Sequence, residues 1–582
     1  FGYDNPGRLL KADFIQNKGG VWSYADADFK MKIGNGVDVT SAYDRNGNIK
    51  KLQQWGLKMT GNAQIDEMEY VYFAGSNQLH SINELGSGAV DHKLSDFTDR
   101  NAGSIDYGYD KNGNQITDLN KGIAGSTGEN LLRSQGAIKY NYLDQPYEIQ
   151  IKDGSNVKGK ITYTYDAAGN KLKKVIEEYA LPYNNNKWTT TTFLYIGGAL
   201  YESKADNRPE TNDYTEVLRF IGHEDGRIRF KDIVGNPRFE YDYMLKDQVN
   251  NVRMVITEEA IDDIYPIATL ESGMQQAEQK FYFFNPSNVV AASSVSGLPS
   301  YINDNGIGNN PVDLVFQSAN SSYLYSLNSN TGKVGLGITL KVMAGDLVNV
   351  FGKSFYNTNN VGGSGANSAV TVLSVLEGIL GSSAGAILNT HGSATDLAGV
   401  TSINTPISDF IALTDRNDPV NTLKPKAAIN WILFDDQLKY VAGDFSPVGQ
   451  NSTLKDHYTA DTKLHDIPIT ENGYIYIYVS NESPVNVYFD NLQVAHRRGG
   501  ILEETHYYPM GLVQQGISTA ALNSLIPQNR FKYGGKEEQK GEFSDLSGLD
   551  WLDFGARAYD PQVGRWVSVD PMAENSRRWS PY

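Results

Sequence analysis

A short motif, tyrosine and aspartate followed by glycine, recurs near the start of this chain and limits its fold more than any other feature. In four copies of the motif, glycine stands four positions after tyrosine: Tyr3 and Gly7, Tyr43 and Gly47, Tyr109 and Gly113, Tyr165 and Gly169. A divergent copy starting at Tyr142 has Pro146 at the glycine position. An aspartate that accepts backbone N–H groups and a glycine with positive φ form a tight turn between strands. The motif therefore predicts stacked β-hairpins.

The residues between the turns follow the period of a β-strand. Ile161, Tyr163 and Tyr165 alternate with Thr162 and Thr164, so each set lies on one face of a strand. The chain has 36 Tyr and 57 Gly, which suits pleated strands joined by tight turns. We therefore predict an all-β fold.

The segment Asp-x-Asn-Gly-Asn within these copies also has some features of a calcium-binding loop. A helical calcium loop needs glycine at its sixth position and glutamate at its twelfth. Here glycine is fourth, counted from aspartate, and no glutamate has the required spacing. We interpret the segments as plain turns.

Charge and composition exclude several classes of function. The formal net charge of −17 argues against nucleic acid as a partner, because nucleic acid binds basic surfaces. Without cysteine there is no disulfide, thiol nucleophile or cysteine-ligated metal, and the eight histidines are scattered singly. Gly381 to Gly385 matches Gly-x-Ser-x-Gly but lies within a predicted helix, so we treat the match as chance. The sequence predicts no cofactor, no metal site and no turnover enzyme.

The composition changes after residue 257, where the tyrosine repeats stop and Ser, Asn, Gly and Val increase. We predict three regions, 1–257, 258–495 and 496–582, the middle one being an inserted β-sandwich. Its strand candidates are Val312 to Gln317, Val334 to Ala344, Ala427 to Asp435 and Tyr474 to Val479, with Val485 to Val494 as the last strand. Ser368 to Asn389 is predicted to be a packed helix rather than a membrane span. Because the sequence starts inside a repeat, we expect a longer native protein.

The strand from Tyr474 to Val479 has large apolar side chains on both faces. Three tyrosines share one face, and Ile475, Ile477 and Val479 share the other. Such a strand is predicted to be covered on both sides. Aromatic side chains of this region either form its core or bind sugar by stacking, and we favour the core.

The motifs resemble those of the YD-repeat (RHS) family. The Tyr-Asp-x-x-Gly-Asn copies look like YD repeats, and Tyr243 to Arg253 is similar to the signature that follows them, with Gln248 for the usual histidine and Asn250 for the usual glycine. Three later stretches resemble the RHS repeat-associated core of Bacteroidetes proteins: Leu502 to Leu512, Arg530 to Glu537 and Leu549 to Pro571. The last strand of the insert is similar to that of jelly-roll, carbohydrate-binding-like modules.

The resemblance implies a hollow spiral of β-hairpins, closed by the core, that encloses or presents a carboxyl-terminal toxin of the same polypeptide. In related shells the core releases the toxin by aspartyl self-cleavage. Asp570 is our candidate for one catalytic carboxylate, with the second in a stretch that follows Tyr582; its alternative role is a turn residue before proline. Arg557 and Arg565 either hold the carboxylates ionised or form structural ion pairs. We take Asp550, Asp553 and Asp560 as structural.

The family setting further implies a secreted or cell-surface protein, exported by secretion machinery such as the type IX route of Bacteroidetes. The alternative hypothesis is a cell-surface adhesin or gliding-associated protein, in which the sandwich binds a surface glycan and the repeats form a stalk.

Overall fold

The computed structural model describes most of the chain as strands joined by turns. The described residues are 1–18, 20–24, 27–58, 61–85, 96–101, 104–207, 213–233, 236–308, 320–358, 370–380, 397–398, 400–413, 424–521, 528–575 and 580–582. The predicted strand Val312 to Gln317 and the Gly-x-Ser-x-Gly segment Gly381 to Gly385 lie outside them. Antiparallel sheets dominate, so the predicted all-β class is confirmed. No described helix is long and apolar enough to cross a membrane.

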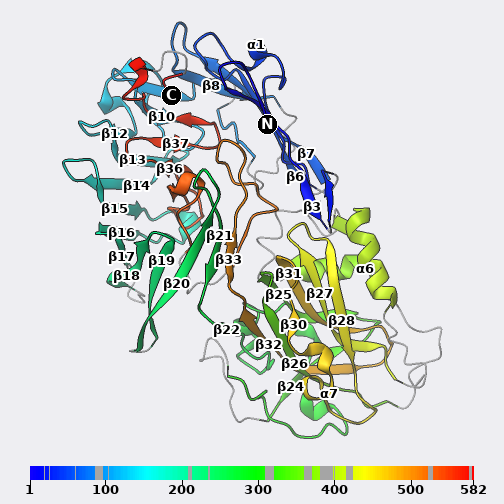
Figure 1. The fold of residues 1–582 in the computed structure, drawn as a ribbon. Coiled ribbons are helices and arrows are strands. Elements are labelled where there is room, and N and C mark those ends of the chain that lie inside the picture. The colour runs from blue at the N-terminus through cyan, green and yellow to red at the C-terminus, as the bar shows by residue number, and fades with distance from the viewer. Residues whose placement is uncertain are drawn as a thin grey trace. The chain divides into compact units, whose positions relative to one another are not determined.

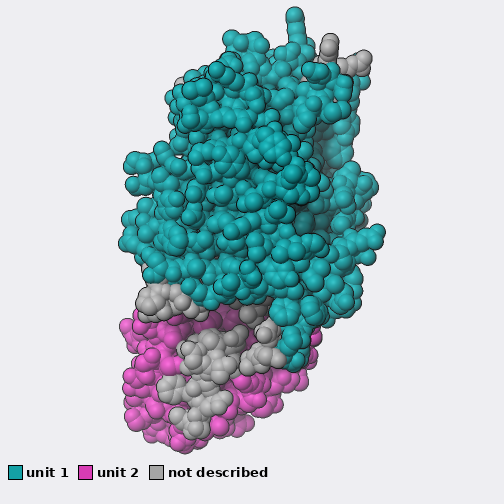
Figure 2. Space-filling model, turned by 90° about the vertical axis from the view of Figure 1, so that its left-hand side faces the viewer, with its two compact units in different colours: residues 1–258, 503–518, 523–582 teal, residues 259–502, 519–522 magenta. Residues whose placement is uncertain are grey.

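Contacts within the chain divide it into two compact units, coloured separately in Figure 2. Unit 1 contains residues 1–258, 503–518 and 523–582, and unit 2 contains residues 259–502 and 519–522. The sequence analysis separated 1–257 from 496–582, whereas most of these two regions belong to one unit. The reason is that the carboxyl-terminal segment packs on the repeats rather than forming a core of its own.

Unit 1 is built from short and medium strands with few helical turns. Its elements are β1 (Gly2–Tyr3), β2 (Leu9–Ala12), β3 (Gln16–Lys18), β4 (Val21–Ser23), β5 (Met31–Ile33), α1 (Val39–Ala42), β6 (Lys51–Lys58), β7 (Gly61–Tyr72), β8 (Leu79–Glu84), β9 (Tyr107–Asp110), β10 (Gln115–Asp118), β11 (Gly128–Leu131), η1 (Arg133–Gln135), β12 (Ile138–Tyr140), β13 (Pro146–Asp153), β14 (Asn156–Tyr165), β15 (Lys171–Glu178), η2 (Pro182–Asn184), β16 (Thr189–Ile196), β17 (Ala199–Asp206), β18 (Tyr214–His223), β19 (Gly226–Ile233), β20 (Asn236–Lys246), β21 (Val252–Thr257), β33 (Ile501–Glu504), η7 (Tyr533–Gly535), β35 (Glu537–Gln539), β36 (Trp551–Asp553), β37 (Ala558–Asp560), β38 (Arg565–Trp566) and η8 (Ala573–Asn575).

The strands from β12 to β21 lie beside one another in chain order, which is the arrangement expected of successive hairpins. Figure 1 shows β12 to β17 stacked one below another, with β19 and β20 to the right of β18. Every pair between them is antiparallel, as between β14 and β15, where Ile161 faces Ile176 and Tyr163 faces Lys174. Along β14, Ile161 and Tyr163 are buried while Thr164 is exposed, so one face of this sheet is apolar. A hairpin array that buries one face is more stable than isolated hairpins.

The carboxyl-terminal segment covers that apolar face. Phe543, Leu549, Trp551 and Val567 share one core with Ile161, Tyr163, Ile176, Phe193 and Phe220 of the repeat strands. The segment forms its own four-stranded sheet in the order β35-β36-β37-β38. A second core belongs to the sheet β1-β2-β5-β6-β7-β8, and Tyr508 and Val563 of the carboxyl-terminal part contribute to it. The first and last parts of the sequence therefore fold together.

Unit 2 is a β-sandwich with a few short helices. Its elements are β22 (Ile261–Ile264), α2 (Gln275–Glu278), η3 (Pro286–Asn288), β23 (Val289–Ala291), η4 (Ala292–Ser294), β24 (Tyr323–Leu327), β25 (Val334–Val342), β26 (Leu347–Phe355), α3 (Val372–Leu380), α6 (Thr401–Leu413), β27 (Ala427–Asp435), β28 (Tyr440–Pro447), β29 (Lys455–Asp456), α7 (His457–Ala460), η6 (Thr462–Leu464), β30 (Ile467–Pro468), β31 (Gly473–Asn481), β32 (Val487–Arg498) and β34 (Thr519–Ala520).

The sandwich core lies between a seven-stranded sheet centred on β26 and β32 and the four-stranded sheet β25-β31-β27-β28. Strand β31 is buried along its whole length. Its residues Ile475, Ile477 and Val479 face the sandwich core, and its three tyrosines pack against α3 and α6. The prediction that both faces of this strand are covered is confirmed. Gly378 of α3 allows this packing, because a Cβ there would meet the Tyr476 hydroxyl at 2.0 Å.

Candidate functional site

The repeated motif forms one kind of turn. In the second copy the carboxylate Oδ1 of Asp44 accepts hydrogen bonds from the backbone N–H groups of Asn46 at 2.8 Å and Asn48 at 2.9 Å. Gly47 has φ +83° and donates its N–H to the Asp44 carbonyl. The Asn48 side chain completes the turn by donating to Asp44 Oδ2 at 2.8 Å. Both aspartate oxygens thus accept hydrogen bonds from the turn's own N–H donors.

The other copies repeat this geometry. Gly7, Gly113 and Gly169 have φ +90°, +87° and +85°, and each donates to the aspartate three residues earlier. Tyr3, Tyr109 and Tyr165 stand at or next to the last residue of β1, β9 and β14, whereas Tyr43 follows α1. In the signature stretch Asn250 takes the glycine place with φ +71°, because asparagine tolerates this region.

The divergent fifth copy was aligned wrongly from the sequence. Its turn begins at Asn141, whose side-chain oxygen accepts from the N–H groups of Leu143 and Gln145. Asp144 takes the glycine place with φ +56°. The tyrosine position is therefore the buried Tyr140, and Tyr142 is exposed. Asparagine and aspartate replace the usual aspartate and glycine because both bond locally and tolerate the left-handed conformation.

Asp570 lies in a turn that contacts the end of the chain. Its backbone N–H donates to the carbonyl of Pro581 at 2.8 Å, and its Oδ1 accepts from Met572 N at 2.8 Å. Its Oδ2 lies 2.9 Å from Arg557 Nη2 in an ion pair whose carboxylate is 35% exposed. The Arg557 guanidinium also stacks on Trp566 at 4.0 Å from the ring centre. Arg557 therefore fixes Asp570 in place.

Arg565 has different partners from Arg557. Its guanidinium donates to the Tyr72 hydroxyl at 3.1 Å and to the Asn77 carbonyl at 2.8 Å, and it lies over the rings of Tyr72 and Tyr582. These contacts tie β38 to the second repeat and to the chain end. Arg565 thus contacts tyrosine side chains and a backbone carbonyl rather than the Asp570 carboxylate.

Asp570 and Arg565 line one cavity of about 500 Å³. Its wall is formed by the first two repeat turns and the chain end, with Tyr3, Gly7, Tyr43, Gly47 and Tyr582 among the lining residues. Among the described residues that line it, Asp570 is the only carboxylate. A paired-carboxylate mechanism at Asp570 needs its second group from another segment.

Buried lysines join the repeat strands to the carboxyl-terminal segment. Lys174 Nζ lies 2.8 Å from Glu542 Oε1, and their side chains are only 2% and 1% exposed. Lys171 bonds Glu537 at 2.5 Å and Asp553 at 2.7 Å, and Lys121 bonds Asp560 at 2.6 Å. Burial lowers the pKa of Lys174 even beside Glu542. Asp553 and Asp560 thus have structural ion-pair partners.

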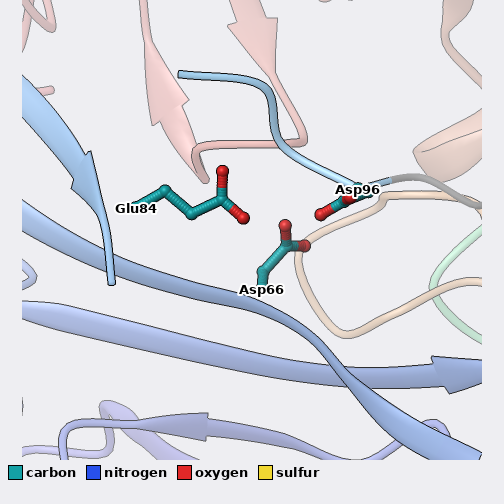
Figure 3. Close-up of side chains that lie close together, drawn as sticks. All are labelled: Asp66, Glu84 and Asp96. Atoms are coloured by element: carbon teal, nitrogen blue, oxygen red, sulfur yellow. The ribbon is translucent and has the colours of Figure 1, made fainter. Parts of the chain in front are cut away.

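A group of acidic side chains that the sequence analysis missed lies in the first sheet of unit 1. Asp66 of β7, Glu84 of β8 and Asp96 point toward one another in Figure 3. Oxygen atoms of all three carboxylates lie within 4.8 Å of one another. Burial raises the pKa of Asp66 well above its usual range, and the charges of Asp96 and Glu84 add to the effect. No sequence signal marks this group, because 18 and 12 positions separate its members.

The three tyrosines of β31, Tyr474, Tyr476 and Tyr478, are buried, so they cannot stack on a sugar at the surface of the insert. A buried carboxylate of the insert, Asp490 of β32, accepts from the hydroxyls of Tyr301 at 2.6 Å and Ser321 at 2.7 Å. Burial among these neutral donors raises the pKa of Asp490 to about 7.

Comparisons with known proteins show only distant similarity. No family model and no curated protein matches the chain. The chain is similar to a crystal structure of TcdB2-TccC3 without its hypervariable carboxyl-terminal region, with 13% identity, a TM-score of 0.19 and coverage of 98% of this chain. It spans 22% of the length of that structure. Another similar structure is the Tc holotoxin pore of Photorhabdus luminescens with a mutated TccC3, at 12% identity and a TM-score of 0.10, covering 98% of this chain and 29% of the other.

A further similar structure is a glycoside hydrolase, with 8% identity and a TM-score of 0.11, covering 83% of this chain and 97% of the other. All three TM-scores are far below 0.5, so neither a shared fold nor a shared function follows from them.

Proposed function

We propose that this chain is an encapsulating and delivery shell of a secreted polymorphic toxin of the YD-repeat type, whose effector follows Tyr582 in the same polypeptide. The observation that carries the proposal is the contact between the chain end and the repeats. The Tyr582 hydroxyl donates to the carbonyl of Gly113 at 2.8 Å, in the turn of the third repeat. A domain that follows Tyr582 is then attached at a point held against the hairpin array.

The packing of the carboxyl-terminal segment supports this role. The segment is joined to the repeat strands by a shared apolar core and by the buried Lys174–Glu542 pair. Because the shared core removes large apolar side chains of the segment from water, the segment is firmly held on the strands. A firmly held segment suits a shell that must keep its cargo attached during export.

We further propose that the shell cuts its effector free, with Asp570 as one of two catalytic carboxylates. One carboxyl would activate water and the other would protonate the leaving amine, which requires the two groups to share one proton. Arg557 would act as a positioning residue that orients Asp570. The second carboxylate would enter the cavity beside Asp570 from a segment that follows Tyr582.

The test is the intact mass of the full-length native protein, as wild type and as Asp570→Asn. The proposal expects a discrete carboxyl-terminal fragment from the wild type and none from the variant. Asp13→Asn is the matched control, since Asp13 lies in an exposed pair with Lys11 and should be dispensable for cutting. If the wild type stays whole, self-cleavage is refuted.

Encapsulation is tested separately by limited proteolysis of the same native protein. An effector domain that survives protease inside the shell, and is digested when produced alone, supports the shell. A full-length protein without any further domain after Tyr582 would refute it. Glycan-dependent stabilisation of unit 2 in that protein would favour the cell-surface adhesin instead. The proposed partners are accordingly the effector domain and a secretion machinery, and the proposed location is outside the cell.

A further inference from the structure

Strand pairing places three polar side chains on one face of the first sheet. Gln54 of β6 lies directly opposite Asp66 of β7, and Met68 lies opposite Glu84 of β8. Residues two apart on a strand share a face, so Asp66 and Met68 point the same way. Directly opposed residues also share a face, which brings Gln54, Asp66 and Glu84 together.

Asp96 joins this face through the segment that packs on it. The backbone N–H of the next residue, Phe97, donates to Asp66 Oδ1 at 2.6 Å, and the Phe97 ring is buried in the same core. The three carboxylates then have oxygens within 4.8 Å of one another. Their side chains point toward one another in Figure 3. Several negative charges this close are unfavourable in a buried place unless a proton or a cation lies between them.

Gln54 provides an independent observation. Its side chain is 2% exposed, and its amide Nε2 lies 3.4 Å from Asp66 Oδ2, so the amide is directed at the acidic group. The other end of the amide, Oε1, is a buried acceptor without a hydrogen-bond partner among the described residues. Leaving a buried acceptor unpaired costs about 1–3 kcal/mol. A half-turn of the amide directs this oxygen to the carboxylates, which is favourable when a cation or a carboxyl proton lies there.

We propose that Asp66, Glu84, Asp96 and the Gln54 amide oxygen bind a divalent cation, and that the cation is Ca²⁺. All four ligands are hard oxygen donors, which Ca²⁺ prefers. Two oxygens on opposite sides of a Ca²⁺ ion lie roughly 4.6–5.2 Å apart, from metal–oxygen distances of about 2.3–2.6 Å. The carboxylate oxygens lie within 4.8 Å of one another, so one ion can contact all three. Mg²⁺ usually keeps several waters and binds only one or two carboxylates, so a group of four protein oxygens suits Ca²⁺ better.

One of the three carboxylates also borders a cavity. Asp96 lines a cavity of about 310 Å³ that lies next to the carboxyl-terminal segment, with Asp118, Asp560 and Gln562 among the other lining residues. By joining Asp96 to β7 and β8, the cation would fasten the segment around Phe97 to the sheet. This role is independent of self-cleavage at Asp570, which lines a different cavity.

The test uses the whole chain after treatment with EGTA and removal of the chelator. Addition of CaCl₂ is followed by calorimetric titration and by thermal unfolding. We expect one binding event per chain and a rise in Tm for the wild type. Asp66→Asn should abolish both. Gln54→Met removes one of the four ligands and should weaken binding by at least the roughly tenfold that loss of an outer-shell group causes.

Asp490→Asn is the matched control, because Asp490 is also a buried carboxylate with a raised pKa but belongs to unit 2. It should leave the calcium response unchanged. If Asp66→Asn does not fold, Glu84→Gln takes its place. A wild type that neither binds nor is stabilised at millimolar CaCl₂ overturns the proposal, and a shared proton then accounts for the acidic group. A response lost in Asp490→Asn, or kept in both Asp66→Asn and Glu84→Gln, assigns the calcium elsewhere and overturns it as well.

Discussion

Arg557 and Asp570 form an ion pair across the turn at the end of β38, with Nη2 2.9 Å from Oδ2. The guanidinium is sandwiched between this carboxylate and the ring of Trp566, 4.0 Å away. The pair gives Asp570 one fixed orientation while leaving its carboxylate partly accessible. Arg557 and Arg565 were both candidates to contact Asp570. Among the described residues, Arg557 does so and Arg565 has other partners.

We expect Arg557→Ala to destabilise unit 1 by about 1–2 kcal/mol, because it removes both a partly exposed ion pair and a cation–π contact. Arg557→Lys keeps the charge but not the planar stacking, and should recover less than half of the loss. Urea unfolding followed by Trp fluorescence measures both variants. Equal stability of Arg557→Ala and the wild type would contradict the structural role of the pair.

Gly113→Ala should cost more than the same change in another copy of the turn. A Cβ at Gly113 would meet Val569 Cγ2 at 2.7 Å and the Tyr582 hydroxyl at 2.8 Å, in addition to its strained φ of +87°. Gly7 has a φ of +90° but nothing within 4 Å of such a Cβ, so Gly7→Ala reports the backbone strain alone. We expect roughly 1–2 kcal/mol for Gly7→Ala and at least about 1 kcal/mol more for Gly113→Ala. Thermal unfolding of the two variants makes the comparison, and equal losses would contradict it.

Lys174→Met should be among the most damaging single changes in unit 1. It leaves the Glu542 carboxylate buried without its cation, which typically costs about 3–5 kcal/mol. The double variant Lys174→Met with Glu542→Leu removes both charges and should recover most of the loss. Lys11→Met is the control, since the Lys11–Asp13 pair is exposed and should contribute at most about 1 kcal/mol. A double-mutant cycle in urea measures the coupling, and a coupling near zero would refute the pairing.

The stability of unit 2 should depend on pH through Asp490. Its pKa is raised to about 7 by burial in the folded protein, from an ordinary value of 3.8. The folded state therefore binds more protons than the unfolded state between these values, and stability falls as pH rises from about 4 to 7. Asp490→Asn should flatten this part of the profile of Tm against pH.

The variant comparison is needed because His457 acts in the opposite direction. Burial lowers the pKa of His457 well below 6.5, so its contribution to stability is lost as pH falls below that value. Both the wild type and Asp490→Asn retain the effect of His457. The difference between their profiles of Tm against pH therefore reports Asp490 alone. If the two profiles are parallel between pH 4 and 7, Asp490 is not protonated in the folded protein.

Local features of this protein were predictable from the sequence because they depend on neighbouring residues. The tyrosine strand of the insert was assigned correctly on both faces, since alternation along a single strand shows which side chains point together. The fifth repeat was misaligned by two positions. Asn141 and Asp144 take the places of aspartate and glycine in its turn, so the residue types there do not match the motif. The helix α3 lies within the predicted helical segment, of which residues 370–380 are described.

The sequence by itself therefore determined the all-β class, the hairpin turns and the change of composition near residue 257, whereas the catalytic role of Asp570 stays a prediction. Only the tertiary structure decided that Arg557 rather than Arg565 contacts Asp570, that Lys174 meets Glu542, and that Asp66, Glu84 and Asp96 form one group. The physical reason is how far apart in the chain the interacting residues are. Turns and strand alternation are set by residues a few positions apart, whereas strand register and the return of the carboxyl-terminal segment bring together charges that are 12 to 368 positions apart in the chain.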